Sequence, residues 1–242
     1  MKKLIYILII GINFTLFSQE KIINSEIVIN NYLKSIGGEE KLNNIITLRK
    51  KTKINMKDVP DLNMEAEVVY KYPNLYSSVV KMSKIGQIQS TKYNGKDCVV
   101  TRYNNNKKTT SNLEGKLLKE KIKDFLPFPL LELKNQGASL IALQIKNEQG
   151  EKINKIYVNE KHKTDSLFFF FDPDEHYLVK KQEISLNSIK TTKYTDYQYF
   201  EGIKLPTVEI SIIKIDGKIA QQSANRIIEV IINEDIQNSF FE

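Results

Sequence analysis

The sequence predicts a mainly β (α+β) fold in which one large antiparallel sheet carries helices on one face. Short runs of alternating apolar and polar residues recur along the chain, as in strands that bury only one side. Turn residues separate these runs, above all the Asn94-Gly95 pair. Few segments show helical spacing, and helices and sheet have to cover each other's apolar surfaces.

Residues 1–18 have the layout of a secretory signal peptide. Two lysines precede an apolar run that ends at Phe17, and Ser18 is a small residue at the expected cleavage site. The run is shorter than the roughly 20 residues that a membrane-spanning helix needs. We therefore expect a periplasmic protein whose residues 19–242 form a single domain; an uncleaved anchor is the alternative.

Composition limits the classes of function. The chain has 242 residues, of which 41% are hydrophobic, enough for a real core. Its net charge of +7 comes from lysines that are spread along the chain and interleave with glutamates, so we expect no nucleic-acid binding.

Cys98 is the single cysteine of the sequence, so no internal disulfide can form. It lies in an apolar run without an accompanying His or Asn motif, which predicts a buried small side chain rather than a nucleophile.

Two helices are expected at the start of the mature chain. Apolar residues recur at helical spacing in Asn24–Ile36, where Asn24 or Ser25 can cap the first turn. Gly37-Gly38 ends this helix. A shorter helix, Glu39–Asn44, begins with two acids, which the helix dipole favours.

The stretch Glu65–Lys81 predicts a β-hairpin with one apolar face. Pro73-Asn74 interrupts the alternation, because proline cannot donate to a strand ladder and asparagine suits a turn. The apolar face carries Ala66, Val68, Tyr70 and Tyr72 before the turn and Tyr76, Ser78, Val80 and Met82 after it. Such a sheet needs a cover on one side, which helices, a second sheet or a ligand can supply.

The remaining strands follow from the same alternation. They are expected at Thr47–Met56, Ile85–Tyr93, Asp97–Tyr103, Ser139–Lys146, Lys155–Val158, Leu167–Phe171, Tyr177–Leu186, Lys190–Tyr199, Thr207–Ile215 and Ala224–Ile232. Residues 58–61 are expected to form a turn, and residues 104–108 a polar loop.

Residues 113–126 have the apolar spacing of one helix, and two prolines prevent it from continuing. The segment includes Phe125 and Phe128 and stays apolar through Leu131. Two interpretations are open: a loop that fills the core, or a lid over a cavity.

Several motifs resemble those of a known family in their order and spacing. Tyr72-Pro73-Asn74-Leu75-Tyr76, a strand and then Asn94-Gly95-Lys96 resemble the basic-Pro-Asn-Leu-aromatic, strand, Asp-Gly-Lys pattern of the periplasmic lipoprotein carrier family. The chain is also similar to the Bacteroidetes outer-membrane lipoprotein-sorting proteins at Tyr32–Gly38, Lys41-Leu42, Ile45, Phe170–Pro173, Leu178–Lys181, Tyr197 and Gly202–Pro206. The resemblance covers nearly all of the mature chain.

The resemblance implies an unclosed half-barrel of about a dozen antiparallel strands, with helices covering the concave face. The cavity of that family receives the acyl chains of lipoproteins. Leu75 and Tyr76 correspond to the apolar pair at its mouth. Tyr72 stands where the carrier has an arginine that helps to hold the lid shut, so this latch and the transfer mechanism do not carry over.

We therefore expect a non-enzymatic carrier or chaperone, a monomer, that needs no cofactor or metal. It would bind an acyl lipid or lipoprotein, deliver it to the outer membrane and meet inner- or outer-membrane transfer proteins. Each buried methylene contributes roughly 0.8 kcal/mol to such binding. The expected lining of the cavity and its mouth is Val68, Tyr70, Tyr72, Leu75, Tyr76, Val80, Phe125, Phe128 and Phe170.

Two other functions stay open: an envelope interaction domain with a filled core, and a hydrolase with a carboxylate or Cys98 at the base of a cleft. Against the hydrolase, the sequence lacks a nucleophile elbow, a phosphate loop and a carboxylate within an apolar stretch. His162 and His176 lie far apart, and Asp172–His176 lacks the spacing of a zinc or calcium site and predicts a turn.

Overall fold

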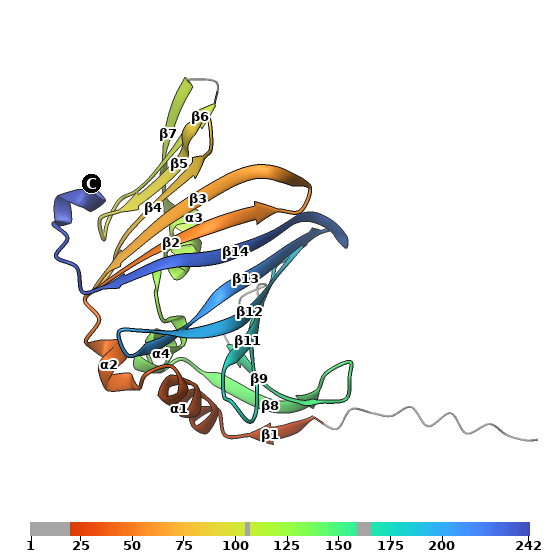
Figure 1. Cartoon of the computed structure of the whole chain (residues 1–242). Helices are drawn as coiled ribbons and strands as arrows, with labels where there is room; N and C mark the ends of the chain where they lie inside the picture. Colours follow the sequence, from red (N-terminus) through yellow and green to blue (C-terminus); the bar gives the residue numbers. More distant parts are fainter. Residues whose placement is uncertain (1–19, 105–106, 159–165) are drawn as a thin grey trace, which may run out of the picture.

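A computed structural model describes residues 20–104, 107–158 and 166–242, which form one large antiparallel sheet that does not close (Figure 1). The predicted signal peptide lies outside the described residues. The sheet has 14 strands: β1 (Lys21–Ile23), β2 (Thr47–Met56), β3 (Val59–Lys71), β4 (Leu75–Met82), β5 (Gly86–Tyr93), β6 (Cys98–Asn104), β7 (Lys107–Leu113), β8 (Leu140–Lys146), β9 (Lys152–Val158), β10 (Ser166–Phe171), β11 (Leu178–Ile184), β12 (Ser188–Phe200), β13 (Ile203–Ile215) and β14 (Lys218–Ile232).

The helices are short. They are α1 (Ser25–Ser35), α2 (Glu39–Asn43), α3 (Gly115–Lys121), α4 (Pro129–Asn135) and the 3₁₀ turns η1 (Ile122–Phe125) and η2 (Asn238–Phe241). The predicted cap of α1 is confirmed, since the Asn24 side chain accepts hydrogen bonds from the backbone N–H groups of Glu26 and Ile27 at 2.8 and 3.2 Å. No helix among the described residues is both long enough and apolar enough to cross a membrane.

Two antiparallel meanders make up the sheet. Strands β2 to β7 form one, and strands β8 to β14 form the other. They join where β14 pairs with β2, and β1 adds to the outside of β8. Because β7 lies at one edge and β8 next to the opposite edge, the link from β7 to β8 has to cross the sheet. Residues 114–139, which contain α3, η1 and α4, make this crossing, and we call them the covering segment.

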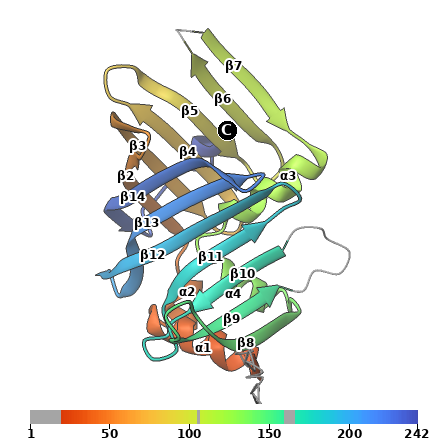
Figure 2. The ribbon, with the colours of Figure 1, turned by 90° about the vertical axis from the view of Figure 1, so that its right-hand side faces the viewer.

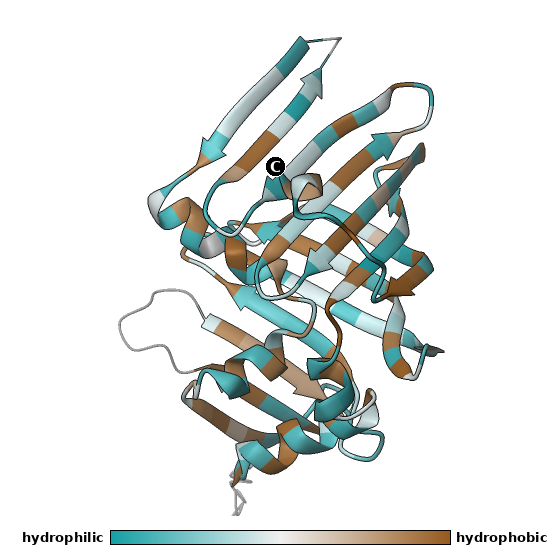
Figure 3. Ribbon diagram, turned by 90° about the vertical axis from the view of Figure 1, so that its left-hand side faces the viewer, coloured by the Kyte–Doolittle hydropathy of each residue, from teal (hydrophilic) through white to brown (hydrophobic). Residues whose placement is uncertain are grey.

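The main core lies between the sheet and the helices on its concave face. Buried side chains of α1 and α4, such as Leu33 and Leu130, share it with Leu48 of β2, Ile156 of β9 and Phe169 of β10. The predicted fold class is therefore confirmed: a mainly β protein with one curved, unclosed antiparallel sheet and helices on its concave face. In Figure 3 the helices carry apolar bands among polar ones, as this packing requires.

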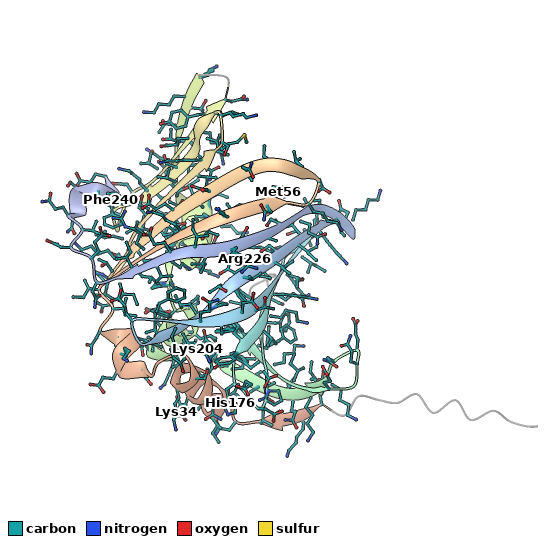
Figure 4. The ribbon with its side chains drawn as sticks, viewed as in Figure 1. Lys34, Met56, His176, Lys204, Arg226 and Phe240 are labelled. Carbon is teal, nitrogen blue, oxygen red and sulfur yellow. The ribbon has the colours of Figure 1, made fainter. Side chains whose placement is uncertain are left out.

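The C-terminal segment covers part of the opposite, convex face. Phe241 is only 1% exposed and packs with Val69 of β3 and with Ile236. Beside this cluster the Arg49 guanidinium pairs with Glu67 and Glu234, each at 2.7 Å. Figure 4 shows the neighbouring Phe240 on η2, on the outer side of β2 to β5. The face of the hairpin that carries Glu67 and Val69, opposite its apolar face, is thus the convex one.

The covering segment differs most from expectation. Residues 113–126 do not form one helix: Leu113 ends strand β7, and α3 covers only Gly115–Lys121 before the chain tightens into η1. Helix α4 was not expected and begins at Pro129, where the missing proline N–H costs no intrahelical hydrogen bond.

Two edge strands and one turn also differ from what the sequence predicts. Strand β7 has an almost fully exposed, polar sequence, so no alternation of apolar and polar residues marks it. Its first residues, Lys107 and Lys108, fall in the expected polar loop. Strand β1 is too short for any periodic pattern to show. The expected turn at residues 58–61 is shorter, because β3 already begins at Val59 and includes Pro60.

Gly37 follows α1 and packs against the start of strand β13, so it offers a test of the contact between the helix and the sheet. Its φ is 135°, and a Cβ there would lie 3.1 Å from the Gly202 carbonyl oxygen and 3.2 Å from Ile203. We expect Gly37→Ala to lower the free energy of unfolding by about 2–3 kcal/mol, from backbone strain plus this clash. Gly137→Ala is the control, because Gly137 also has a positive φ but open space around it. Chemical denaturation measures both; equal losses would show that the contact with β13 contributes nothing.

Candidate functional site

The predicted apolar face of the β3–β4 hairpin lies on the concave side of the sheet. Tyr70 pairs across the strands with Tyr76, and their rings lie 5.4 Å apart in an edge-to-face arrangement. Val68 pairs with Ser78, and Ala66 with Val80, on the same face. Because opposite residues of an antiparallel pair share a face, these six residues lie on one face of the hairpin, as the alternation predicts.

The covering segment is anchored to this face by aromatic stacking. The Phe125 ring stacks on Tyr76, with 4.1 Å between ring centroids, and also contacts Tyr93 of β5. Phe125 is 4% exposed and belongs to a small cluster with Tyr76, Tyr93 and Cys98. Val68 packs at the edge of this cluster. The first anchor therefore ties the covering segment to the β2–β7 meander.

A second anchor ties the covering segment to the other meander. Phe128, Leu130 and Leu131 are each less than 10% exposed and lie in the main core with Phe169 of β10 and the buried face of α1. The prolines at 127 and 129 separate the two anchors, since they stop the chain from forming one continuous helix. The segment thus fills the core at two places, and cavities remain beside it.

Among the described residues, three cavities adjoin the covering segment. The first cavity, about 420 Å³, lies between Leu42–Leu48, the Tyr72–Leu75 turn and residues 125–135. The second cavity, about 490 Å³, runs under η1 and α4 from Tyr93 to strands β10 and β11. The inner cavity, about 160 Å³, lies under residues 126–130 and reaches β12 and β13. Leu126 lines all three, so they meet at one point of the segment.

Several predicted lining residues are brought together here. Tyr72 and Leu75 line the first cavity, Tyr70 and Phe128 line the first and inner cavities, and Phe125 lines the first and second. Tyr72 is 71% exposed, in keeping with a position at the rim.

The other predicted residues lie elsewhere. Tyr76 sits behind Phe125, and Val68 and Val80 belong to the concave face but line none of the three cavities. Phe170 points to the convex side, so its prediction as a cavity residue is wrong: the Lys180 Nζ lies 3.8 Å from its ring centroid. Its neighbour Phe169 lines the second and inner cavities instead, since successive strand residues face opposite ways.

The inner cavity is partly polar, which the sequence did not indicate. Lys50, Lys181 and Glu209 line it, and these residues stand on three strands that are far apart in the chain. Only cross-strand register brings them to one place; for example, Glu209 pairs with Tyr194. Lys50 lies against the face of the Tyr70 ring, 5.4 Å from its centroid.

Tyrosine hydroxyls surround the same cavity. Tyr32, Tyr70, Tyr194 and Tyr197 all line it. Burial raises the pKa of each of these four hydroxyls above its ordinary value, and the nearby Glu209 carboxylate adds to this for Tyr70, Tyr194 and Tyr197. They are therefore neutral O–H donors near neutral pH. Tyr197 donates to the Leu178 carbonyl oxygen at 2.8 Å, which fixes its ring.

The candidate catalytic groups have pKa values unsuited to the hydrolase alternative. Burial raises the pKa of the Cys98 thiol, so the reactive thiolate is disfavoured. Asp124 lies at the second cavity. Burial raises the pKa of its carboxyl group, but the positive charges of Lys121, Lys190 and Lys181 together bring this pKa below its ordinary value. This direction favours the ionised carboxylate at neutral pH, whereas a general acid needs a raised pKa. Among residues 20–104, 107–158 and 166–242, no three His, Cys, Asp or Glu side chains are grouped to hold a metal ion.

Comparisons with known proteins identify the fold. No family model matches the sequence, and no curated protein matches it. Among solved structures the chain is similar to a LolA superfamily protein from Nitrosomonas europaea, with a TM-score of 0.56 and 12% sequence identity. The similarity covers 91% of this chain and 98% of the other. The unclosed half-barrel expected from the sequence resemblance thus has a counterpart in a solved structure.

The stacking of Phe125 on Tyr76 can be tested by its effect on stability. We expect Phe125→Ala to lower the free energy of unfolding by about 3–5 kcal/mol, because it leaves a cavity at the first anchor. Phe240→Ala is the matched control, since Phe240 is 37% exposed and should cost about 1 kcal/mol or less. Urea denaturation compares them; a small loss at Phe125 would mean that the segment is a loosely held lid.

The buried position of Cys98 predicts slow labelling. In the native protein at neutral pH, we expect a thiol reagent to react with Cys98 at the rate at which the protein unfolds, at least about a hundredfold slower than in urea. Absorbance of the released thiolate dye follows both rates. Rapid labelling of the native protein would contradict the buried, high-pKa environment and would revive a chemical role for this residue.

Proposed function

We propose that this protein is a non-enzymatic carrier that binds acyl chains of a lipid or lipoprotein on the concave side of the sheet. The observation that carries the proposal is the pair of adjoining first and second cavities, of about 420 and 490 Å³, beside the covering segment. Each lies in the size range of small-ligand sites. They share Phe125 and Leu126, so one extended ligand could occupy both.

The lining supports an acyl chain as the ligand. Aromatic and aliphatic side chains such as Tyr70, Phe125, Phe128 and Leu131 line one part of the first cavity, and polar side chains, among them Asn43, Asn74 and Glu132, line the rest. A chain of ten methylenes would gain about 8 kcal/mol from burial before the cost of its ordering is subtracted. A Kd of 1 μM corresponds to about 8 kcal/mol, so a longer chain, a second chain or contacts to a polar group have to offset the cost of ordering.

The inner cavity supports an amphiphile rather than a pure hydrocarbon. Its Lys50 and Lys181 ammonium groups, its Glu209 carboxylate and its neutral tyrosine hydroxyls offer both donors and acceptors to a polar group. An ester, phosphate or amide next to the acyl chains could hydrogen-bond there. Lipids and acylated protein N-termini both have this combination.

The proposal includes a place of action. The signal-peptide layout of residues 1–18 supports export to the periplasm. The fold likeness to a LolA superfamily protein supports the sequence resemblance to the periplasmic lipoprotein carriers. We infer a monomer that receives its cargo at the inner membrane and delivers it toward the outer membrane through transfer proteins.

An envelope interaction domain is the alternative. It requires that the concave face be filled by the protein's own side chains. The three cavities weigh against a filled core, and they lie under the segment whose packing would have had to fill them.

A charge placed at Leu126 tests the proposed site. Leu126 lines all three cavities but belongs to none of the buried core clusters, so Leu126→Asp should fold. We expect it to weaken the binding of a fluorescent fatty acid by roughly tenfold or more, because an acyl chain would have to desolvate the carboxylate. Fluorescence titration gives the Kd.

Leu186→Asp is the matched control, since Leu186 is 87% exposed at the tip of the β11–β12 hairpin. Its Kd should stay within about twofold of the wild type. If both variants bind the probe like the wild type, the cavities are not the site. If the wild-type protein takes up no probe, the interaction domain becomes the better interpretation.

A further inference from the structure

A second candidate surface lies on the outer, convex side of the sheet, over strands β1 and β8 to β12. Cross-strand pairs place Ile22, Leu143, Lys155, Phe170, Lys180 and Lys193 side by side on this side. Ile141, Tyr157 and Phe168 form the next row. We call these nine residues the outer patch. Figure 2 looks onto these strands, with α1 and α4 behind them.

No described element covers the outer patch. Helices α1 and α4 pack on the opposite face, with Ile156 and Phe169. The C-terminal segment covers the convex side at β2 to β5, through Phe240 and Phe241, on the other meander. As a result Ile22 is 77% exposed and Ile141 40% exposed, although both sit within the sheet, whereas Leu143, Tyr157 and Phe168 are half-buried and Phe170 is 5% exposed beneath the Lys180 ammonium. Exposed apolar side chains on an uncovered face of a sheet mark interaction surfaces.

Two lysines of the outer patch, Lys180 and Lys193, repel each other in the folded protein. Lys180 is directly opposite Lys193 on the neighbouring strand, and like charges in this position are destabilising. Lys155 and Lys180 lie over the rings of Phe168 and Phe170, at 4.5 and 3.8 Å from the centroids. Among the described residues, no carboxylate forms an ion pair with any of these three lysines.

The neighbouring charges also act on the Lys180 pKa. Burial is the largest cause that lowers the Lys180 pKa, and the positive charges of Lys193 and Lys155 lower this pKa further. The negative charge of Glu148 raises it. A negatively charged surface placed against the patch would relieve this repulsion. The arrangement is therefore complementary to an anionic partner.

We propose that the outer patch docks this protein onto the surface of a bilayer that contains anionic lipids. Aromatic rings and aliphatic side chains next to lysines are the combination that favours the membrane interface, where lysine stems stay apolar and their ammonium groups reach the headgroups. The cations of the patch are all lysines, whose flexible point charges suit mobile headgroups better than a fixed carboxylate geometry.

Docking in this way goes beyond the proposed carrier function but is compatible with it. The cavities open on the other face of the same sheet, so a protein held by the outer patch keeps the covering segment and its cavities free. The two activities can be measured separately, since the patch contributes no side chain to the three cavities.

Vesicle co-sedimentation tests the proposal, with the protein purified from its native cells in the processed form that those cells hold. The probes are phosphatidylcholine vesicles with and without phosphatidylglycerol. The combined variant Lys155→Gln, Lys180→Gln and Lys193→Gln should lower the partition coefficient onto the anionic vesicles by roughly a hundredfold. The control Lys96→Gln, Lys107→Gln and Lys108→Gln removes the same charge from exposed sites on the other meander and should change it only severalfold.

Thermal unfolding shows whether the variant still folds normally. Losing the repulsion between Lys180 and Lys193 offsets losing the lysine contacts with the Phe168 and Phe170 rings, so the Tm of the patch variant should stay close to that of the wild type. Equal losses of binding in the two variants, or equal wild-type binding to neutral and anionic vesicles, would overturn the proposal. So would the absence of vesicle binding in a protein whose patch instead binds an acidic protein.

Discussion

The link between strands β7 and β8 is the constraint on which the rest of the structure depends. Because the sheet does not close, these consecutive strands lie near opposite edges, and the chain has to return across the whole sheet. It crosses on the concave side, where the apolar faces of both meanders need a cover. Topology alone thus places one segment, with α3, η1 and α4, over the concavity.

This segment is too short and too interrupted to fill the space it crosses. It contributes Phe125 to the cluster around Tyr76 and Phe128, Leu130 and Leu131 to the main core, and prolines separate these two anchors. The first and second cavities lie beside the anchors, and the inner cavity lies beneath the irregular stretch between them. The cavities are therefore a consequence of the open sheet and its single crossing. The same open architecture leaves the convex face of β8 to β12 bare, while the C-terminal segment covers the convex face at β2 to β5.

The local sequence pattern predicts an element correctly where a single local rule determines its structure. Strand β2, the apolar face of the β3–β4 hairpin, the Asn24 cap and the Asn94-Gly95 turn each follow from alternation, capping or turn chemistry within a few residues. The polar edge strand β7 and the short strand β1 carry no such signal. Phe170 was misplaced because a run of four phenylalanines has no polar residue to show which face is buried. The inner cavity could not be predicted, since Lys50, Lys181 and Glu209 meet only through the register of the whole sheet.

The central claim is that the concavity holds an acylated ligand, and native mass spectrometry of the protein purified from its own cells tests it most directly. We expect a population heavier than the bare chain, and organic extraction should release an acyl-bearing lipid or peptide from it. A single species at the mass of the bare protein, with no acyl compound in the extract, would contradict the account. The cavities would then be packing defects, and the aromatic concave face an ordinary core.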